Sequence, residues 1–353
     1  MSKELKIGDF TMKIPLIQGG MGVGVSLSGL AGAVALCGGV GVISTAQIGF
    51  KETDFKENPL RANLRAIKQE LDKARKIAKE GMIAMNIMVA TQGYEDYVRA
   101  AVKAGVDLII SGAGLPIQLP KLVEGSKTLI APVVSSLKSA SLICRMWEKK
   151  FQKVPDLLVV EGPKAGGHLG FSKKELENIE SLNYSGVIKD IIAFAKDHGK
   201  KYKKEIPVVV GGGVYDKADM KDIMQLGADG VVVASRFVTT KECDASWEYK
   251  NAYIKAKEED ISIIKSPVGM PGRAINNVFL DRVKKERIPI KACYHCIVTC
   301  NPKTTPYCIT DALIKAVEGD VENGLLFCGS NVYRANKIES VEEVMEEFSK
   351  WDS

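Results

Sequence analysis

The sequence predicts an α/β protein whose main body is a TIM (β/α)8 barrel, followed by a C-terminal helical region with a cysteine cluster. Three observations predict the barrel. Short β-branched runs alternate with helical stretches, the runs count to eight, and about 225 residues hold them all. A doubly wound sheet, the alternative, would more often stop at about five to seven strands. We therefore expect residues 1–240 to form the barrel and residues 241–353 to form a second region.

Eight apolar runs are the expected barrel strands. In chain order they are Ile14–Gln18, Val40–Thr45, Ile83–Val89, Leu108–Ser111, Leu129–Ser135, Leu157–Glu161, Pro207–Val210 and Gly230–Ala234. Runs that are apolar at consecutive positions are typical of parallel strands covered by helices on the outside of a barrel. The stretches between these strands have the apolar spacing or capping residues of helices. The expected helices are Asn63–Lys79, Tyr94–Ala104, Leu137–Lys150, Val187–Lys196 and Asp216–Leu226.

The stretch Gly29–Thr45 is glycine-rich and shorter than the ~20 residues of a membrane span, so it is expected to be a packed helix followed by a buried strand. After Phe237 the alternation stops. The tail begins with a helical-looking Ser246–Glu258 and ends in a charged helix, so it forms a second region and not a ninth unit.

The composition indicates a globular protein. The chain has 46% hydrophobic and 26% charged residues, which excludes a disordered or fibrous chain. The net charge of +6 is mild and spread out, so it favours an acidic partner over nucleic acid. The first residues, MSKELKIGDF, carry charges where a signal peptide needs an apolar stretch. We expect a cytoplasmic protein with neither membrane nor nucleic-acid binding.

Glycine and small polar residues follow the predicted strands at the end where barrels place their chemistry. Gly211, Gly212 and Gly213 close the seventh strand, and Ala234 and Ser235 close the eighth. Backbone N–H groups of these two loops often bind a phosphate. The alternative is that the glycines only make a tight turn. A dinucleotide fold is disfavoured, because the Gly22–Val23–Gly24 sequence lacks the third glycine of GxGxxG.

His168 follows the sixth strand in EGPKAGGHLG, between glycines that leave its imidazole on an open backbone. Since the pKa of histidine lies near neutrality, His168 suits general acid–base work beside a flavin or a carbonyl. The alternative is an ordinary loop histidine. Its position at the catalytic rim, and the presence of only two other histidines, favour catalysis.

Four of the eight cysteines form the pattern C-x2-C-x3-C-x7-C at Cys293, Cys296, Cys300 and Cys308. Eight cysteines are too sparse for a disulfide scaffold, and four close thiols are more than packing requires, so the cluster predicts a metal site in a reducing compartment. Compact spacing near a proline favours a [4Fe–4S] cluster over zinc. His295 lies inside the loop and is expected to point away. Cys328, followed by glycine, is expected to be a buried small residue like the other isolated cysteines.

Several segments resemble one known family. IPLIQGGMGVGVS, APVVSS, EGPKAGGHLGF and PVVVGGGV, in this order along the barrel, resemble the nitronate monooxygenase (2-nitropropane dioxygenase) superfamily, which includes the FabK-type enoyl-acyl-carrier-protein reductases. KSPVGMPGRAIN, the four-cysteine loop and GLLFCGSNVYRANKI resemble its iron–sulfur branch, the FabX-like acyl-carrier-protein dehydrogenase/isomerases. The gap before the last cysteine is shorter than expected for that branch.

The resemblance implies an FMN at the barrel rim and His168 as the catalytic histidine. The residues it implies around the FMN are Gly19, Gly20, Met21, Gly22, Asn86, Ser135, Glu161, Gly166, Gly167, Gly212, Gly213, Ala234 and Ser235. The first four of these and Asn86 would face the ring, Ser135 and Glu161 would line its edge, and the last four would take the phosphate. Cys293, Cys296, Cys300 and Cys308 would hold a [4Fe–4S] cluster beside it, in a loop packed on the barrel rim.

Three functions are compatible with these residues. The first is an FMN and iron–sulfur oxidoreductase that dehydrogenates, isomerises or reduces acyl thioesters, with His168 as acid or base. The second is a nitronate monooxygenase that uses oxygen and needs no cluster. The third is a redox-sensing flavin and iron–sulfur protein. An acyl-carrier protein is acidic, and Lys200, Lys201, Lys203 and Lys204 are a candidate docking patch for it. A homodimer is also expected.

Overall fold

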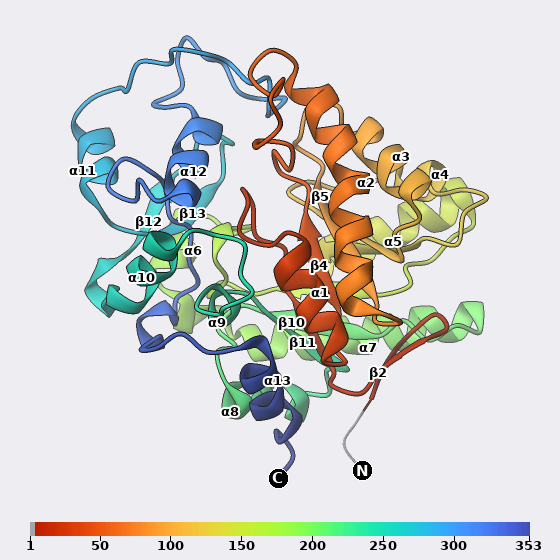
Figure 1. The fold of residues 1–353 in the computed structure, drawn as a ribbon. Helices are drawn as coiled ribbons and strands as arrows, with labels where there is room; N and C mark the ends of the chain where they lie inside the picture. The colour runs from red at the N-terminus through yellow and green to blue at the C-terminus, as the bar shows by residue number, and fades with distance from the viewer. Residues whose placement is uncertain (1–3) are drawn as a thin grey trace.

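The eight predicted strands form one parallel barrel in the computed structural model, which describes residues 4–353, so the first three residues of the expected barrel region lie outside it. The strands are β3 (Leu16–Gln18), β4 (Gly41–Ser44), β5 (Ile83–Met88), β6 (Leu108–Gly112), β7 (Leu129–Val134), β8 (Leu158–Glu161), β10 (Val208–Gly211) and β11 (Gly230–Val233). They pair in the order β3-β11-β10-β8-β7-β6-β5-β4. A parallel bridge between Ile17 and Val40 joins the two ends, which confirms the TIM barrel (Figure 1).

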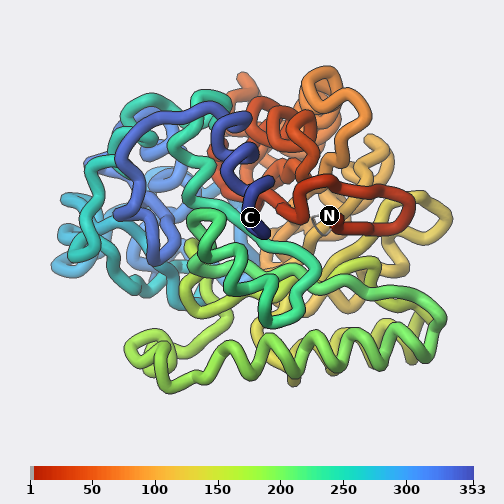
Figure 2. Tube along the Cα trace, turned by 90° about the horizontal axis from the view of Figure 1, so that it is seen from below, coloured from red at the N-terminus to blue at the C-terminus, as the bar shows by residue number. Residues whose placement is uncertain are grey.

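Helices cover the outside of the barrel between successive strands (Figure 1). The long ones are α1 (Ser28–Leu36), α2 (Pro59–Ala78), α3 (Tyr94–Ala104), α5 (Leu137–Phe151), α7 (Tyr184–Tyr202) and α8 (Lys217–Gln225), and the short ones are α4 (Leu119–Leu122), α6 (Lys173–Glu177) and α9 (Ser235–Val238). Side-chain caps start four of them: Asn58 accepts from the Arg61 N–H at 3.1 Å, and Ser136, Ser172 and Asp216 form capping boxes. The helix α7 runs along one edge of the molecule in Figure 2.

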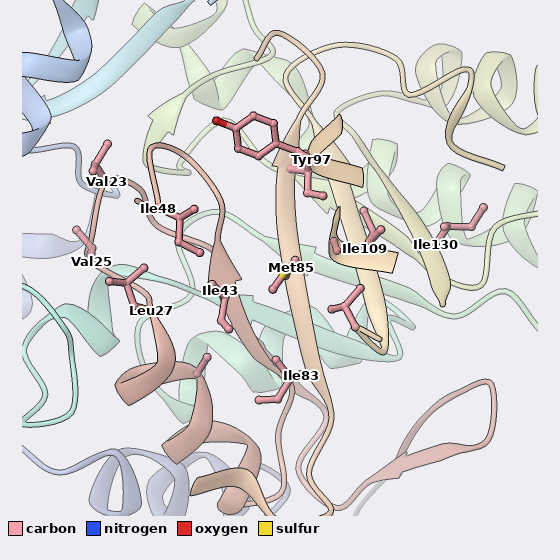
Figure 3. Packing of buried hydrophobic residues seen from close by; sticks show 14 of the residues in the cluster. Val23, Val25, Leu27, Ile43, Ile48, Ile83, Met85, Tyr97, Ile109 and Ile130 are labelled. Carbon is pink, nitrogen blue, oxygen red and sulfur yellow. The ribbon is translucent and has the colours of Figure 1, made fainter. Parts of the chain in front are cut away.

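Each barrel strand buries one face inside the barrel and the other under the helices. Ile43, Met85 and Ile109 point to the helix layer, where they pack in the cluster of Figure 3. Their neighbours Val42 and Ala84 belong to a separate cluster inside the barrel. Successive side chains of a strand alternate between faces, so consecutive apolar residues fill both layers.

A hairpin closes the N-terminal end of the barrel. It consists of β1 (Leu5–Ile7) and β2 (Phe10–Met12), which pair antiparallel. Its buried residues Leu5, Ile7 and Met12 pack with the residues inside the barrel. The opposite end of the barrel therefore remains for ligands, as the fold predicts.

The tail contains four further α-helices and two strands, which pair with each other. Its elements are α10 (Trp247–Lys255), β12 (Ile261–Lys265), β13 (Pro271–Ile275), α11 (Val278–Lys285), α12 (Ile309–Glu318) and α13 (Val341–Ser349), with 3-10 helices at Glu258–Asp260 and Val332–Arg334 and another in the barrel at Ile179–Leu182. Helix α10 corresponds to the predicted Ser246–Glu258, and α13 is the predicted charged final helix. In Figure 1, α11, α12, β12 and β13 gather on the side of the barrel away from α3 and α4.

The tail is divided among three hydrophobic clusters, and the one that holds Tyr249 and Tyr253 of α10 is the main cluster of the barrel. Helix α13 places Val344 and Phe348 in a cluster with barrel helices α1 and α8. By contrast, α11, α12 and the cysteine loop have a satellite cluster that includes Phe279, Ile297 and Tyr307. Among the described residues, no helix has the length and apolarity needed to cross a membrane.

Candidate functional site

Two adjoining cavities open at the C-terminal ends of the barrel strands. Both are lined by Gly20, Asn86, Glu161, Ala234 and Ser235, so they are continuous with each other. Every residue implied for FMN lines at least one of them, namely Gly19, Gly20, Met21, Gly22, Asn86, Ser135, Glu161, Gly166, Gly167, Gly212, Gly213, Ala234 and Ser235. The fold thus brings these residues together from six loops.

The two cavities lie side by side and are both partly open to solvent. A flat cofactor in one cavity would therefore lie beside a second molecule in the other.

The glycines at the first cavity allow close approach of its walls. A Cβ on Gly20 would lie 2.5 Å from the Cβ of Asn86, so glycine is needed to keep Asn86 at the cavity wall. Gly212 and Gly213 have φ values of +102° and +96°, which L side chains rarely adopt. Both glycines lie in the bend that follows β10, and this bend lines the first cavity.

The tail closes the cavity at its predicted phosphate end. The Gly329 N–H donates to Ser235 Oγ at 2.8 Å, and Asn331 Nδ2 donates to the Gly213 carbonyl at 2.6 Å. Lys164 adds a cationic side chain to the same lining. This end offers a cation, a hydroxyl and glycine backbone, which are the groups that bind a phosphate. The donor set fits the phosphate and ring of FMN.

The sequence analysis missed Asn331 and Lys164. Lys164 lies in the EGPKAGGH segment and could have been found by its position beside the glycines. Asn331 lies in the tail, 118 residues from Gly213, and no local signal connects the two.

Glu161 ends strand β8 and lies where the two cavities meet. Burial raises the pKa of its carboxyl to about 8. The carboxyl is therefore protonated at neutral pH and can donate a hydrogen bond into the cavity. Its backbone carbonyl accepts from the Tyr184 hydroxyl at 2.9 Å, which fixes the strand end.

His168 lies in the second cavity and is held by the tail. It belongs to β9 (Gly167–His168), which pairs with β13, so the loop after β8 becomes the third strand of the β12-β13-β9 sheet. The His168 Nε2 atom lies 2.7 Å from Ser266 Oγ, and the Phe327 ring contacts the imidazole edge-on at 4.9 Å. Burial lowers the pKa of His168 to about 4, so the imidazole is neutral at neutral pH.

The second cavity, which His168 lines, also has apolar lining residues that the sequence analysis did not predict. They are Met88, Leu115, Val133, Val134, Met270, Leu313 and Phe327. Tyr249 and Tyr253 from α10 also line this cavity, and Tyr253 donates to the Phe327 carbonyl. Side chains from the tail therefore form much of the wall opposite the barrel.

The structure does not assemble the predicted metal centre. Within residues 4–353, no group of three or more His, Cys, Asp or Glu side chains is placed to hold a metal ion. Cys293, Cys296, Cys300 and Cys308 are free thiols, with Cys293 exposed and the other three half-buried.

The cysteines lie on different segments but are neighbours. Burial first, and a nearby thiol in addition, raises the pKa of Cys296, Cys300 and Cys308. The Cys296 carbonyl accepts from the Gln92 N–H at 3.1 Å, which ties this part of the loop to the barrel segment after β5. Cys308 stands at the first turn of α12, and Cys293 lies on the exposed side of the loop. As placed, the thiols do not fit a [4Fe–4S] cluster or a zinc ion.

The isolated cysteines differ from one another in exposure. Cys144, Cys243 and Cys328 are buried, as expected, whereas Cys37 is half-buried. Cys328 also lines the second cavity, where burial raises the pKa of its thiol to about 12. It is therefore a thiol and not a thiolate at neutral pH.

The basic run on α7 is largely neutralised by neighbouring carboxylates. Lys200 lies 3.1 Å from Asp197, and Lys201 and Lys204 pair with Glu148 and Asp156. A docking patch made of these lysines would have to compete with these ion pairs.

Comparisons with known proteins agree with the fold. The family model described as Nitronate monooxygenase matches residues 3–350. A probable nitronate monooxygenase of Staphylococcus saprophyticus is 26% identical over 310 residues, covering 79% of this chain and 80% of that protein. The structure of FabK from Thermotoga maritima has a TM-score of 0.73 at 22% identity and covers 96% of this chain and 93% of its own. A nitroalkane oxidase from Streptomyces ansochromogenes has a TM-score of 0.71 at 17% identity, with 96% and 95% covered.

Proposed function

Because the chain belongs to the nitronate monooxygenase family and is an FMN-dependent oxidoreductase, we propose that it acts on an acyl thioester, by dehydrogenation, isomerisation or enoyl reduction. The observation that carries this proposal is the apolar lining of the cavity that holds His168. An acyl chain needs apolar surface near the reacting carbons, and Met270, Leu313 and Phe327 line the same cavity as His168.

The residues that would hold FMN lie along both cavities. Gly212, Gly213 and Ser235 would bind its phosphate, while Gly20 and Asn86 would line its ring. When bound, FMN supplies the two-electron redox chemistry, and the protein supplies binding, orientation and electrostatics.

Two protein groups would act on the substrate next to the ring. The protonated Glu161 carboxyl can donate a hydrogen bond where the cavities meet, and neutral His168 presents its imidazole in the second cavity. Each would hold a proton near the reacting carbons.

Nitronate oxidation is the second candidate, favoured by the printed names of relatives. The S. saprophyticus protein is called a probable nitronate monooxygenase, as is a Staphylococcus aureus protein that is 30% identical over 133 residues. An alkyl nitronate is small and anionic, so it would contact His168 and would not need the apolar lining of the second cavity.

The iron–sulfur proposal is supported by the spacing of Cys293, Cys296, Cys300 and Cys308 alone. We would purify the protein without oxygen and assay iron, sulfide, zinc and released flavin on one sample. About four irons and four sulfides per chain would support the iron–sulfur branch. FMN with zinc, or with no metal, would contradict it and favour nitronate oxidation.

The substrate is tested by mixing the FMN-loaded protein without oxygen with saturated and unsaturated acyl thioesters of several lengths, carried on acyl-carrier protein or on coenzyme A. Saturated thioesters should bleach the flavin absorbance if they are dehydrogenated, and the unsaturated ones should reoxidise reduced flavin. An alkyl nitronate under oxygen is the parallel assay. Oxygen uptake with the nitronate and no response to any thioester would favour the second candidate, while no turnover with either would favour a redox sensor.

The control for cofactor binding is Gly212→Ala. Its Cβ would lie 2.9 Å from the Gly162 carbonyl oxygen at a φ of +102°, so the predicted phosphate loop must shift. We expect FMN binding about tenfold weaker or more, with the barrel still folded by circular dichroism. Unchanged FMN affinity would place the phosphate elsewhere.

The partners follow from this proposal. An acyl-carrier protein would be the acidic partner of the mildly basic chain, and the homodimer is tested by light scattering. A preference for carrier-bound over coenzyme A thioesters that disappears at high salt would support the acidic partner.

A further inference from the structure

The contact between His168 and Ser266 is a direct, buried hydrogen bond between a barrel loop and the tail. Nε2 and Oγ are 2.7 Å apart, although the two residues are 98 positions apart in the chain. Ser266 is only 2% exposed, so water does not compete for its hydroxyl. The bond therefore fixes the imidazole of His168.

The hydrogen-bond inventory of Ser266 decides which atom donates. Its Oγ accepts from the Val268 N–H at 3.3 Å, and within residues 4–353 its other partner is His168 Nε2. If Nε2 carried the proton, the buried Ser266 hydroxyl would have no acceptor for its own hydrogen, which is a costly arrangement. The Ser266 hydroxyl and Nε2 are both satisfied when Ser266 donates to an unprotonated Nε2.

The proton of the neutral imidazole then lies on Nδ1. Within residues 4–353, Nδ1 of His168 has no hydrogen-bond partner. It is also not one of the fully buried polar atoms without a partner. Nδ1 is therefore open to the second cavity, which His168 lines. Two neighbours hold the ring in this orientation. The Phe327 ring meets the imidazole edge-on, with the two ring centres 4.9 Å apart, and Gly272 on β13 pairs with His168.

We propose that Ser266 is a positioning residue that holds His168 in the Nδ1–H tautomer, so that His168 donates a hydrogen bond from Nδ1 to an oxygen of the substrate. The acceptor would be an oxygen conjugated to the reacting carbon, as in a thioester carbonyl or a nitronate. The identity of this acceptor rests on the proposed function, whereas the tautomer does not.

The tautomer is measurable because the chain has only three histidines, His168, His198 and His295. We would label the FMN-loaded protein with ¹⁵N-histidine and record long-range ¹H–¹⁵N correlation spectra, which separate protonated from unprotonated ring nitrogens. The His168→Gln variant assigns the signals by their loss. The wild-type spectrum should show Nδ1 protonated and Nε2 unprotonated in His168, and the opposite pattern would overturn the proposal.

Three variants test the role of Ser266. Ser266→Ala should give His168 a population of the Nε2–H tautomer and lower kcat on the order of tenfold to a hundredfold, the range known for groups that orient functional histidines in metal sites. KM should change less than kcat. Ser266→Thr keeps a hydroxyl and should restore the tautomer, at least in part.

The matched control is Ser262→Ala on the same hairpin, since the Ser262 hydroxyl is buried without a hydrogen-bond partner. It should leave the His168 signals unchanged. An unchanged tautomer in Ser266→Ala would overturn the positioning role. Should Ser266→Ala fail to fold, the wild-type spectrum still decides the tautomer. Absence of turnover with all substrates would count against the proposed function and not against the tautomer.

Discussion

The barrel and the tail contribute different groups to the same cavity. The barrel provides mainly backbone and small residues, such as Gly20, Gly212 and Ala234. The tail provides side chains, including Met270, Leu313 and Phe327. Backbone groups and small residues suit a cofactor common to a family, while larger side chains set the shape that a substrate must match. We therefore expect the barrel to supply most of the proposed cofactor site, with Gly329 and Asn331 of the tail closing its phosphate end, and substrate choice to depend also on how the tail is docked.

The sharpest test of this division is His168, which the barrel supplies and the tail positions. His168→Ala should keep its FMN, because the glycine loops are intact, and should lose about 10²–10⁴-fold in kcat. Flavin release and single-turnover rates measure the two effects. An unchanged kcat would remove His168 from the mechanism, and a lost flavin would show that cofactor and substrate sites are not separable.

The next test breaks the attachment of the tail. Asp244 accepts from the backbone N–H groups of Leu27, Gly29 and Leu30 at 2.8, 3.0 and 3.1 Å, so it caps the start of α1 from the tail. Asp244→Ala should lower the free energy of unfolding by about 2–3 kcal/mol in urea titrations, since three buried N–H groups lose their acceptor. Asp222→Ala, an exposed carboxylate on α8, is the control and should change little. A loss below about 0.5 kcal/mol would show that packing alone docks the tail.

A pH-dependent test addresses the barrel side of the cavity. The pKa of Glu161 is raised by burial to about 8, so its folded form binds a proton more tightly than the unfolded chain does. The contribution of this carboxyl to the free energy of unfolding is fully present below its unfolded pKa, near 4.5, and is lost as the pH rises toward 8. In flavin-free protein, Glu161→Gln should match the wild type at pH 4.5 and be more stable by about 4–5 kcal/mol at pH 8.5. Parallel stability curves would contradict the raised pKa.

The smallest effect is expected far from both regions of the cavity. Lys200 and Asp197 are exposed on α7 and form a pair at 3.1 Å. Lys200→Ala should change the free energy of unfolding by less than about 0.5 kcal/mol, as exposed pairs do. Its KM for an acyl-carrier-protein substrate should also stay within about twofold. A rise in KM for the carrier-bound substrate alone would support Lys200 as part of a docking patch for acyl-carrier protein.

Much of the barrel follows from local sequence. The runs at Ile83–Val89 and Leu108–Ser111 match β5 and β6 within a residue, and Tyr94–Ala104 matches α3. Glycines at strand ends located the cavity, because a parallel barrel brings all its carboxyl ends to one rim. The cysteine spacing, by contrast, predicted a metal centre, and within residues 4–353 no group of three or more His, Cys, Asp or Glu side chains is placed to hold a metal ion.

By itself, the sequence determined the eight strands, the helices between them and the rim that carries the glycines and His168, since hydrophobic periodicity and strand ends are local properties of the chain. The tertiary structure alone decided the partners of these residues. Pairing of β9 with β13, the 2.7 Å contact from His168 to Ser266 and the cap of α1 by Asp244 join positions far apart in the chain. Local patterns carry no information about such partners, because a side chain meets them only after the tail has packed against the barrel.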